Sequence, residues 1–242
     1  MARRAIASID NDFNSVLVLL KDRGIVATDP KPNLLQVAKS IHAATFSLIL
    51  WRFRLKRLAP HSRVFIEEIA SDALQILPQV LMGYGKTAKL LTRGILENGL
   101  RHIYFADHPI EFLRMNREAK WYMGVEQLCD YAKSHPSFIQ TETKFDGLAQ
   151  VTSLYSTLSA GVHGRTVSDL EMRVALQKIA YDQTAAEDAM RSILKCAQAI
   201  NFLLAIFQRE QMRTFQIEDQ RTILRTMPMA ARKVWTEHDV HA

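Results

Sequence analysis

The feature that most constrains the fold is a row of three charged residues in an otherwise largely apolar stretch between Pro78 and Pro109. Arg93, Glu97 and Arg101 follow one another at intervals of four residues. Because four residues advance a helix by only about 40° beyond a full turn, the three side chains form one narrow stripe. Apolar side chains cover most of the remaining surface, so the sequence predicts a buried helix with a charged stripe.

Charged side chains inside a protein core cost free energy unless they satisfy one another or face a polar pocket. The stripe is therefore either an internal ladder of ion pairs or a functional site. Near its end, Arg101 is followed directly by His102 and, with five further residues between, by His108. The end of this helix is thus a second candidate location for chemistry.

A second motif with the same spacing lies further along the chain. Tyr155, Ser159 and His163 are again four residues apart, so a helix over residues 144–162 points all three side chains one way. Two glycines flank the histidine, which places it where the helix ends and where a ligand can be admitted.

Composition and periodicity indicate an all-α fold. The chain has 242 residues with 48% hydrophobic content, and only 9 are glycine and 7 proline, so it can bury a substantial core. Long segments show the 3.6-residue repeat of helices, and no segment alternates convincingly like a strand. The sequence therefore predicts a helical bundle with long antiparallel helices.

The predicted helices follow from periodicity, caps and breakers. We expect them at residues 8–23, 33–58, 62–77, 86–108, 110–133, 144–162, 184–211 and 217–235, the last interrupted at Pro228. Gly24 ends the first helix, and Pro78 kinks or breaks the chain after the third. Residues 134–143 are expected as a loop in which His135 faces solvent, and residues 165–182 as a mostly irregular polar stretch.

The same pattern divides the chain into three parts. Residues 1–60 are expected as N-terminal helices that form an arm or a bundle extension, 61–213 as the helical core, and 214–242 as a C-terminal amphipathic segment and tail. No secretory signal is evident, and no run reaches the roughly 18 apolar residues that a membrane span needs. We therefore expect a cytoplasmic protein without a membrane segment, with Cys129 and Cys196 as free buried thiols.

The formal net charge of +6 and the pI near 9.4 would not oppose an anionic partner. Four basic residues at one helix end, Arg52, Arg54, Lys56 and Arg57, could contact nucleic-acid phosphates. Basic residues near helix C-termini also complement the helix dipole, so both interpretations stay open. The chain has no Glu-x-x-His spacing and no Cys/His ligand set, so neither a metal nor a cofactor is expected.

Three motifs of the chain resemble those of the HEPN superfamily: Arg93-x3-Glu97, Arg101-His102-x5-His108 and Tyr155-x3-Ser159-x3-His163. More narrowly, the chain looks like bacterial members in which an RxxxE helix pairs with a YxxxSxxxH helix, over roughly residues 60–210. The resemblance implies a helical bundle, commonly dimeric. Many members are metal-independent ribonucleases of toxin–antitoxin, phage-defence or RNA-processing systems, whose signature is an arginine and a later histidine with four to six residues between them.

The resemblance also implies roles for these residues. His163 or His108 would be the base that removes a 2′-hydroxyl proton, and Arg101 or Arg93 the clamp that holds the phosphate. The others would orient or support these groups through hydrogen bonds: Glu97, Tyr155, Ser159 and His102. Arg101 and His108 satisfy the family signature literally, whereas His163 would have to take its arginine from the neighbouring helix.

Two hypotheses follow. The first is a ribonuclease effector of a bacterial toxin–antitoxin or phage-defence system that acts on RNA as a homodimer, with a protein partner or antitoxin. The second is a non-catalytic helical adaptor or regulator that binds a protein or a nucleic acid. In the second case the polar motifs form a buried network that locks two helices together. The sequence leaves open whether the protein is an enzyme.

Overall fold

The structure is a computed structural model that describes residues 9–139, 141, 146–163, 175 and 179–237. These residues form only α-helices and turns, which confirms the predicted all-α fold. The helices are α1 (Ile9–Asp22), α2 (Pro32–Arg54), α3 (Pro60–Leu81), α4 (Gly85–Asp107), α5 (Pro109–Arg117), α6 (Val125–Ser134), α7 (Pro136–Ile139), α8 (Gly147–His163), α9 (Gln183–Phe207), α10 (Arg209–Arg213), α11 (Ile217–Thr226) and α12 (Met229–Glu237).

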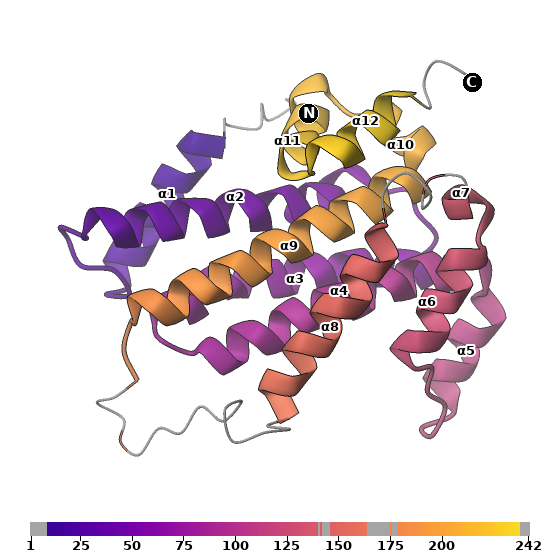
Figure 1. Cartoon of the computed structure of the whole chain (residues 1–242), viewed down its shortest axis with the longest axis horizontal. Helices are drawn as coiled ribbons and strands as arrows, with labels where there is room; N and C mark the ends of the chain where they lie inside the picture. Colours follow the sequence, from indigo (N-terminus) through magenta and orange to yellow (C-terminus); the bar gives the residue numbers. More distant parts are fainter. Residues whose placement is uncertain (1–8, 140, 142–145, 164–174, 176–178, 238–242) are drawn as a thin grey trace.

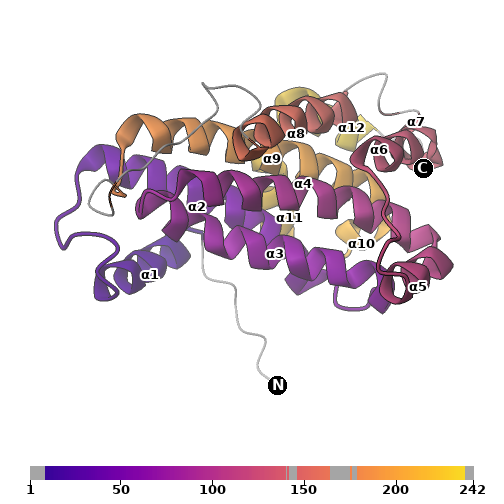
Figure 2. The same ribbon diagram turned by 90° about the horizontal axis from the view of Figure 1, so that it is seen from below.

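Four long helices, α2, α3, α4 and α9, form the centre of the molecule (Figure 1). Helix α4 contacts α3, α9 and α8, so it is covered on several sides. Helix α8 lies over α4 and α9 (Figure 2), and α1 packs across α2 at a steep angle (Figure 1). Helices α5 to α7 gather at the C-terminal end of α4, while α10 to α12 cover the end of α9. The charged stripe of α4 therefore meets α8 along one edge.

A buried hydrogen-bond network connects α2, α9 and α11. The indole nitrogen of Trp51 donates to Asn201 Oδ1 at 2.8 Å, and Asn201 Nδ2 donates to the hydroxyls of Ser47 and Thr226, both at 2.7 Å. Trp51 and Asn201 are fully buried. Because the amide is satisfied on both its oxygen and its nitrogen, the network fixes the relative positions of the three helices.

The turn between α3 and α4 depends on a glycine. Gly83 has a φ of +84°, a conformation that other residues rarely adopt. A β-carbon at this position would lie 2.2 Å from the backbone oxygen of Ala180, just before α9. The turn and the start of α9 can therefore approach each other only because residue 83 lacks a side chain.

Several predicted helix boundaries were wrong. Helix α2 ends at Arg54 and not at residue 58, and α3 continues through Pro78 to Leu81 instead of breaking there. The single helix predicted over 110–133 is two helices, α5 and α6, separated by a seven-residue connection that ends at Gly124, the residue preceding α6. Aromatic and apolar residues in this connection had extended the apparent helical repeat.

The predicted loop at 134–143 contains the short helix α7, and the helix predicted over 184–211 ends at Phe207 before α10 begins. His135 does not face solvent: its side chain is only 15% exposed and its Nε2 lies 3.1 Å from Asp107 Oδ2. Most of the polar stretch predicted over 165–182 lies outside the described residues. The division into three parts at residues 60 and 213 stays a prediction.

Helices α2 and α9 are long and apolar enough to cross a membrane by length and composition alone. In the protein, 56% and 61% of these two apolar stretches are buried, as expected of core helices that face several neighbours. The cytoplasmic location stays a prediction. Cys129 and Cys196 are free and buried, as predicted.

Two buried ionisable residues lie beside the stripe but outside it. His102 is fully buried, donates from Nδ1 to the Ser62 carbonyl at 2.9 Å and accepts from Gln208 Nε2 at 2.9 Å. Burial lowers the pKa of His102 from 6.5 to about 4. Asp72 of α3 is 8% exposed and faces Gly94, where a β-carbon would lie 2.6 Å from its carboxylate. Burial, with the nearby charge of Glu68, raises the pKa of Asp72 from 3.8 to about 6.

We expect Asp72→Asn to stabilise the protein near pH 7 and to leave its stability at acid pH almost unchanged. The folded state holds the Asp72 proton up to a pH of about 6, whereas the unfolded chain releases it near 3.8. The proton on Asp72 therefore stabilises the folded state fully below pH 3.8, and this stabilisation is lost as the pH rises to about 6. At pH 7 the ionised carboxylate costs about 2 to 3 kcal/mol, which asparagine avoids.

His102 acts in the opposite direction, because its stabilising contribution is complete above pH 6.5 and is lost as the pH falls to about 4. In the wild type the two slopes oppose each other over this window. In Asp72→Asn the contribution of Asp72 to the pH dependence is removed while that of His102 remains, so urea unfolding should show stability that rises more steeply with pH than in the wild type. Parallel pH profiles for the two proteins would contradict these assignments.

Candidate functional site

The carboxylate of Glu97 is the centre of a polar cluster between α4 and α8. Its Oε1 accepts hydrogen bonds from Arg93 Nη2 at 2.8 Å and from the Tyr155 hydroxyl at 2.9 Å. Its Oε2 lies 3.7 Å from Arg101 Nη2. The three α4 side chains are 14% to 29% exposed, so the stripe is mostly buried. Glu97 therefore connects both arginines of the predicted stripe to the predicted α8 motif.

Arg93 is held from two directions. Besides its ion pair with Glu97, its guanidinium lies over the Tyr155 ring, 5.1 Å from the ring centroid. Burial opposes the charge, but the hydrogen bonds and negative charge of these two partners raise the pKa of Arg93 above its ordinary value. Burial, followed by the hydrogen bond and charge of Glu97, raises the pKa of Tyr155. Arg93 thus remains a cation and Tyr155 a hydrogen-bond donor at neutral pH.

His163 lies at the open end of the cluster. Its Nε2 is 3.4 Å from Arg93 Nη1, although the two residues are 70 positions apart in the chain. The His163 side chain is exposed at the last residue of α8, whereas Ser159, one turn earlier, is buried. The cluster thus passes from a buried polar network to a solvent-facing imidazole within one helical turn.

Two polar atoms in the cluster lack a well-formed hydrogen bond within the described part of the chain. They are the hydroxyl oxygen of Ser159 and the Nε atom of Arg93, both fully shielded from solvent. Ser159 lies one helical turn after Tyr155 on the same face of α8, but its hydroxyl forms no hydrogen bond with a described residue. Buried polar atoms without partners are uncommon, and these two show that the described residues alone do not satisfy the hydrogen bonds of the cluster.

Of the other predicted site residues, Arg101 joins the Glu97 cluster, whereas His102 and His108 lie elsewhere. Arg101 contacts Glu97 and Asn98, the latter at 3.4 Å. His102 points into the core, as described above. His108 follows the end of α4, donates from Nδ1 to the Tyr104 carbonyl at 2.8 Å and stacks on the Tyr104 ring. It is about 22 Å along the helix axis from Arg93, given a rise of about 1.5 Å per residue.

The basic cluster at the end of α2 is divided between two roles. Arg54 forms an ion pair with Asp219 of α11 and a hydrogen bond with Gln216 at 3.4 Å, so it holds α2 against α11. Arg52, Lys56 and Arg57 are exposed. Arg52 and Lys56 line a shallow groove of about 400 Å³. Three of the four residues that were predicted to contact a nucleic acid are thus exposed on the surface.

Sequence reasoning missed two groups. Lys89 extends the α4 stripe by one further step of four, and its side chain lies against Gly161 of α8. The second group is formed around Asp107, whose Oδ2 accepts from the Tyr131 hydroxyl at 2.6 Å and lies 3.1 Å from His135 Nε2. The sequence could have indicated Lys89, because it precedes Arg93 by four residues. It could not have indicated the Asp107 group, because Asp107 meets Tyr131 and His135 only in the folded chain. Among the described residues, no three His, Cys, Asp or Glu side chains are arranged to hold a metal ion.

We expect Arg93→Ala to destabilise the fold by about 2 to 3 kcal/mol, because it leaves the mostly buried Glu97 with a weaker set of donors; the loss stays below that of a fully buried pair. The matched control is Arg63→Ala, which removes an ion pair with the same i,i+4 spacing whose side chains are 41% and 46% exposed. That change should cost less than about 1 kcal/mol. Chemical unfolding measures the free energy of unfolding of both variants. Equal losses of stability would show that the α4 stripe behaves like an ion pair on the surface.

Comparison with known proteins finds no matching protein family, no matching curated protein and no matching solved structure. The assignment of a function therefore depends on the geometry of the described residues. That geometry consists of an anchored guanidinium and an exposed imidazole brought together from two helices.

Proposed function

We propose that the protein is a metal-independent, HEPN-like ribonuclease whose site consists of Arg93 and His163. The observation that carries the proposal is the 3.4 Å approach of Arg93 Nη1 to the exposed His163 Nε2. No arginine precedes His163 in the sequence at the spacing of the family signature, and Arg93 would supply this arginine from the neighbouring helix. The setting would be a bacterial toxin–antitoxin or phage-defence system, as the sequence motifs suggest.

Cleavage of RNA without a metal needs a base for the 2′-hydroxyl proton and a cation for the charge that develops on the phosphate. His163 would accept the proton from the 2′-oxygen, which attacks the adjacent phosphorus and expels the 5′-oxygen. The products are a 2′,3′-cyclic phosphate and a 5′-hydroxyl end, which takes its proton from solvent. Arg93, fixed by Glu97 and Tyr155, would bind the non-bridging phosphate oxygens.

The present contact is compatible with such a role. A guanidinium only donates hydrogen bonds, so His163 must present an unprotonated Nε2 towards Arg93. At 3.4 Å the contact is longer than a good N–H hydrogen bond, so it is weak. A bound RNA strand could replace this contact: its phosphate oxygens would accept hydrogen bonds from Arg93, and the adjacent 2′-hydroxyl would donate to His163.

The adaptor hypothesis has its own supporting observation. Glu97 is bound by Arg93, Arg101 and Tyr155, so the cluster also serves to lock α4 against α8. A cluster that only holds two helices together does not need to catalyse a reaction. The two interpretations differ at His163, because the lock is complete without it and the ribonuclease is not.

We expect His163→Ala to reduce cleavage of single-stranded RNA by at least about 100-fold, the usual contribution of a general base. Because His163 is exposed, the melting temperature should change by less than about 2 °C. Gel analysis of labelled RNA, together with growth of cells after induction, measures the activity. Inactivity of the wild type towards RNA in both assays would leave the adaptor as the better interpretation.

The control is His108→Ala, which removes the histidine of the literal family signature. This residue lies about 22 Å from Arg93 along α4, so cleavage should persist in the variant. Loss of cleavage in His108→Ala with activity retained in His163→Ala would reverse the assignment. Persistence of cleavage in both folded variants would exclude both histidines as the base.

We also propose that the chain forms a homodimer. Helix α5 supports this, because none of its residues is buried and its Ile110 and Leu113 side chains are 70% and 52% exposed on adjacent turns. Light scattering across micromolar concentrations should give twice the chain mass of 27.6 kDa. Ile110→Glu should shift the mass to that of one chain, whereas a monomeric wild type would rule out the dimer.

A further inference from the structure

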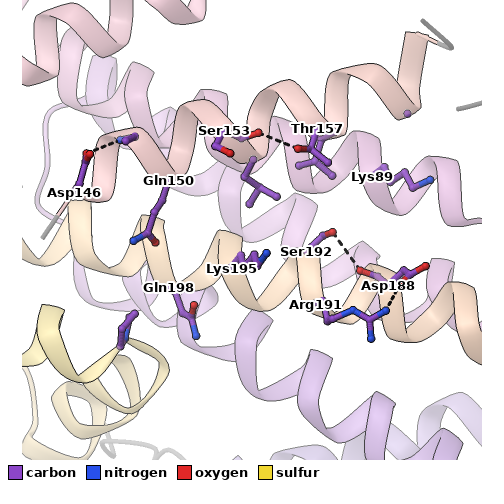
Figure 3. A pocket seen from close by; sticks show the side chains of 15 residues that line it. Lys89, Asp146, Gln150, Ser153, Thr157, Asp188, Arg191, Ser192, Lys195 and Gln198 are labelled. Carbon is purple, nitrogen blue, oxygen red and sulfur yellow. Dashed lines mark hydrogen bonds and ion pairs between the residues drawn. The ribbon is translucent and has the colours of Figure 1, made fainter. Parts of the chain in front are cut away.

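A large groove lies between α8 and α9, outside the Arg93–His163 cluster. Its volume is about 970 Å³. Figure 3 shows that Gln150 of α8 and Gln198 of α9 lie near one end, that Lys89 and Arg191 lie near the other, and that Lys195 lies between them. Most of the lining residues have polar or charged side chains, which can bind the polar groups of a hydrophilic organic ligand, while the apolar part of the surface can contact its carbon atoms.

The charges of the groove favour an anion. The two carboxylates among the described lining residues are already engaged: Asp146 accepts from the backbone N–H of Ala149 at 2.9 Å, and Asp188 forms an ion pair with Arg191. Lys195 is exposed, and no carboxylate of the described residues pairs with it. A positive charge therefore remains in the middle of the groove after the internal pairs are counted.

Lys89 adds a second cation at the end that adjoins His163. The absence of a side chain at Gly161 lets the Lys89 stem lie against α8, since a β-carbon there would be 3.2 Å from Lys89 Cδ. Lys89 also precedes Arg93 by four residues, so both side chains lie on the same edge of α4. The cationic end of the groove thus continues into the Arg93–His163 cluster.

The remaining lining is rich in groups that bind hydroxyls. The side-chain amides of Gln150 and Gln198 donate and accept hydrogen bonds, and hydroxyls of α8 lie between them and Lys89 (Figure 3). No aromatic side chain is among the described residues that line the groove, so these residues offer a nucleobase no stacking partner. The recognised chemistry is therefore phosphate and sugar and not the base.

We propose that the α8–α9 groove binds the phosphate and ribose of a nucleotide, with the phosphate between Lys89 and Lys195. The nucleotide can be free or part of an RNA strand, because both present the same chemistry. Binding at this site does not require that His163 cleaves RNA. It would place a phosphate next to the cluster whether that cluster is catalytic or structural.

The test is fluorescence anisotropy of a labelled short oligouridylate with the full chain in the His163→Ala background, so that cleavage cannot obscure binding. Lys195→Glu should weaken binding about tenfold, since it removes one phosphate contact and adds repulsion. The control Lys120→Glu makes the same change in net charge at an exposed residue between α5 and α6, and should weaken binding less than about twofold. Lys195→Gln, a milder change at the same site, should give an intermediate loss.

Competition with unlabelled uridine monophosphate and with inorganic phosphate identifies the source of the ligand. Displacement by the mononucleotide supports a free nucleotide, and displacement only by an unlabelled strand supports RNA. Equal weakening by Lys195→Glu and Lys120→Glu would overturn the proposal, because only overall charge would then matter. Lack of binding of both the strand and the mononucleotide would also overturn it, and either result leaves the cleavage test of His163 unaffected.

Discussion

The arrangement of α4 and α8 depends on one shared acceptor, the carboxylate of Glu97. It binds Arg93 and Arg101 of its own helix and Tyr155 of the other, in surroundings that are mostly closed to water. A carboxylate placed there without these donors would be costly, and so would the two guanidiniums without the carboxylate. The apolar packing of α4 against α8 and the polar cluster that Glu97 forms with Arg93, Arg101 and Tyr155 therefore require each other.

This dependence explains why part of the candidate site could be predicted from the sequence. The intervals of four in Arg93-Glu97-Arg101 and Tyr155-Ser159-His163 are local properties of helices, and both stripes are present on α4 and α8 as expected. Their mutual contact is not local, and the pairing of Arg93 with His163 was only one of the arrangements left open. Helical periodicity states which side chains share a face but not which helix they meet.

The errors of the sequence analysis have similar causes. Pro78 lies inside α3, although a proline in a helix removes one hydrogen bond, because the surrounding residues of α3 pack along α4 on both sides of it. The break between α5 and α6 was missed because aromatic residues continue the apolar pattern through it. His135 was predicted to face solvent, and His102 was predicted to support the site. Both predictions were wrong because a tertiary contact decides each position: Asp107 pairs with His135, and Gln208 pairs with His102. Such tertiary contacts lie beyond any single-segment pattern.

The close approach of Gly83 to Ala180 has a consequence for how the chain can vary. It fastens the start of α9 to the turn between α3 and α4, while the end of α8 is fastened to α4 by Tyr155 and Arg93. The stretch that joins His163 to Ala180 thus has both of its ends set by other parts of the fold. Closing a longer connection between fixed ends costs little extra entropy, since the cost grows only with the logarithm of length. A longer connection between these two fixed ends would therefore cost the fold little, as long as His163 and Ala180 keep their positions beside α4 and beside the turn before it.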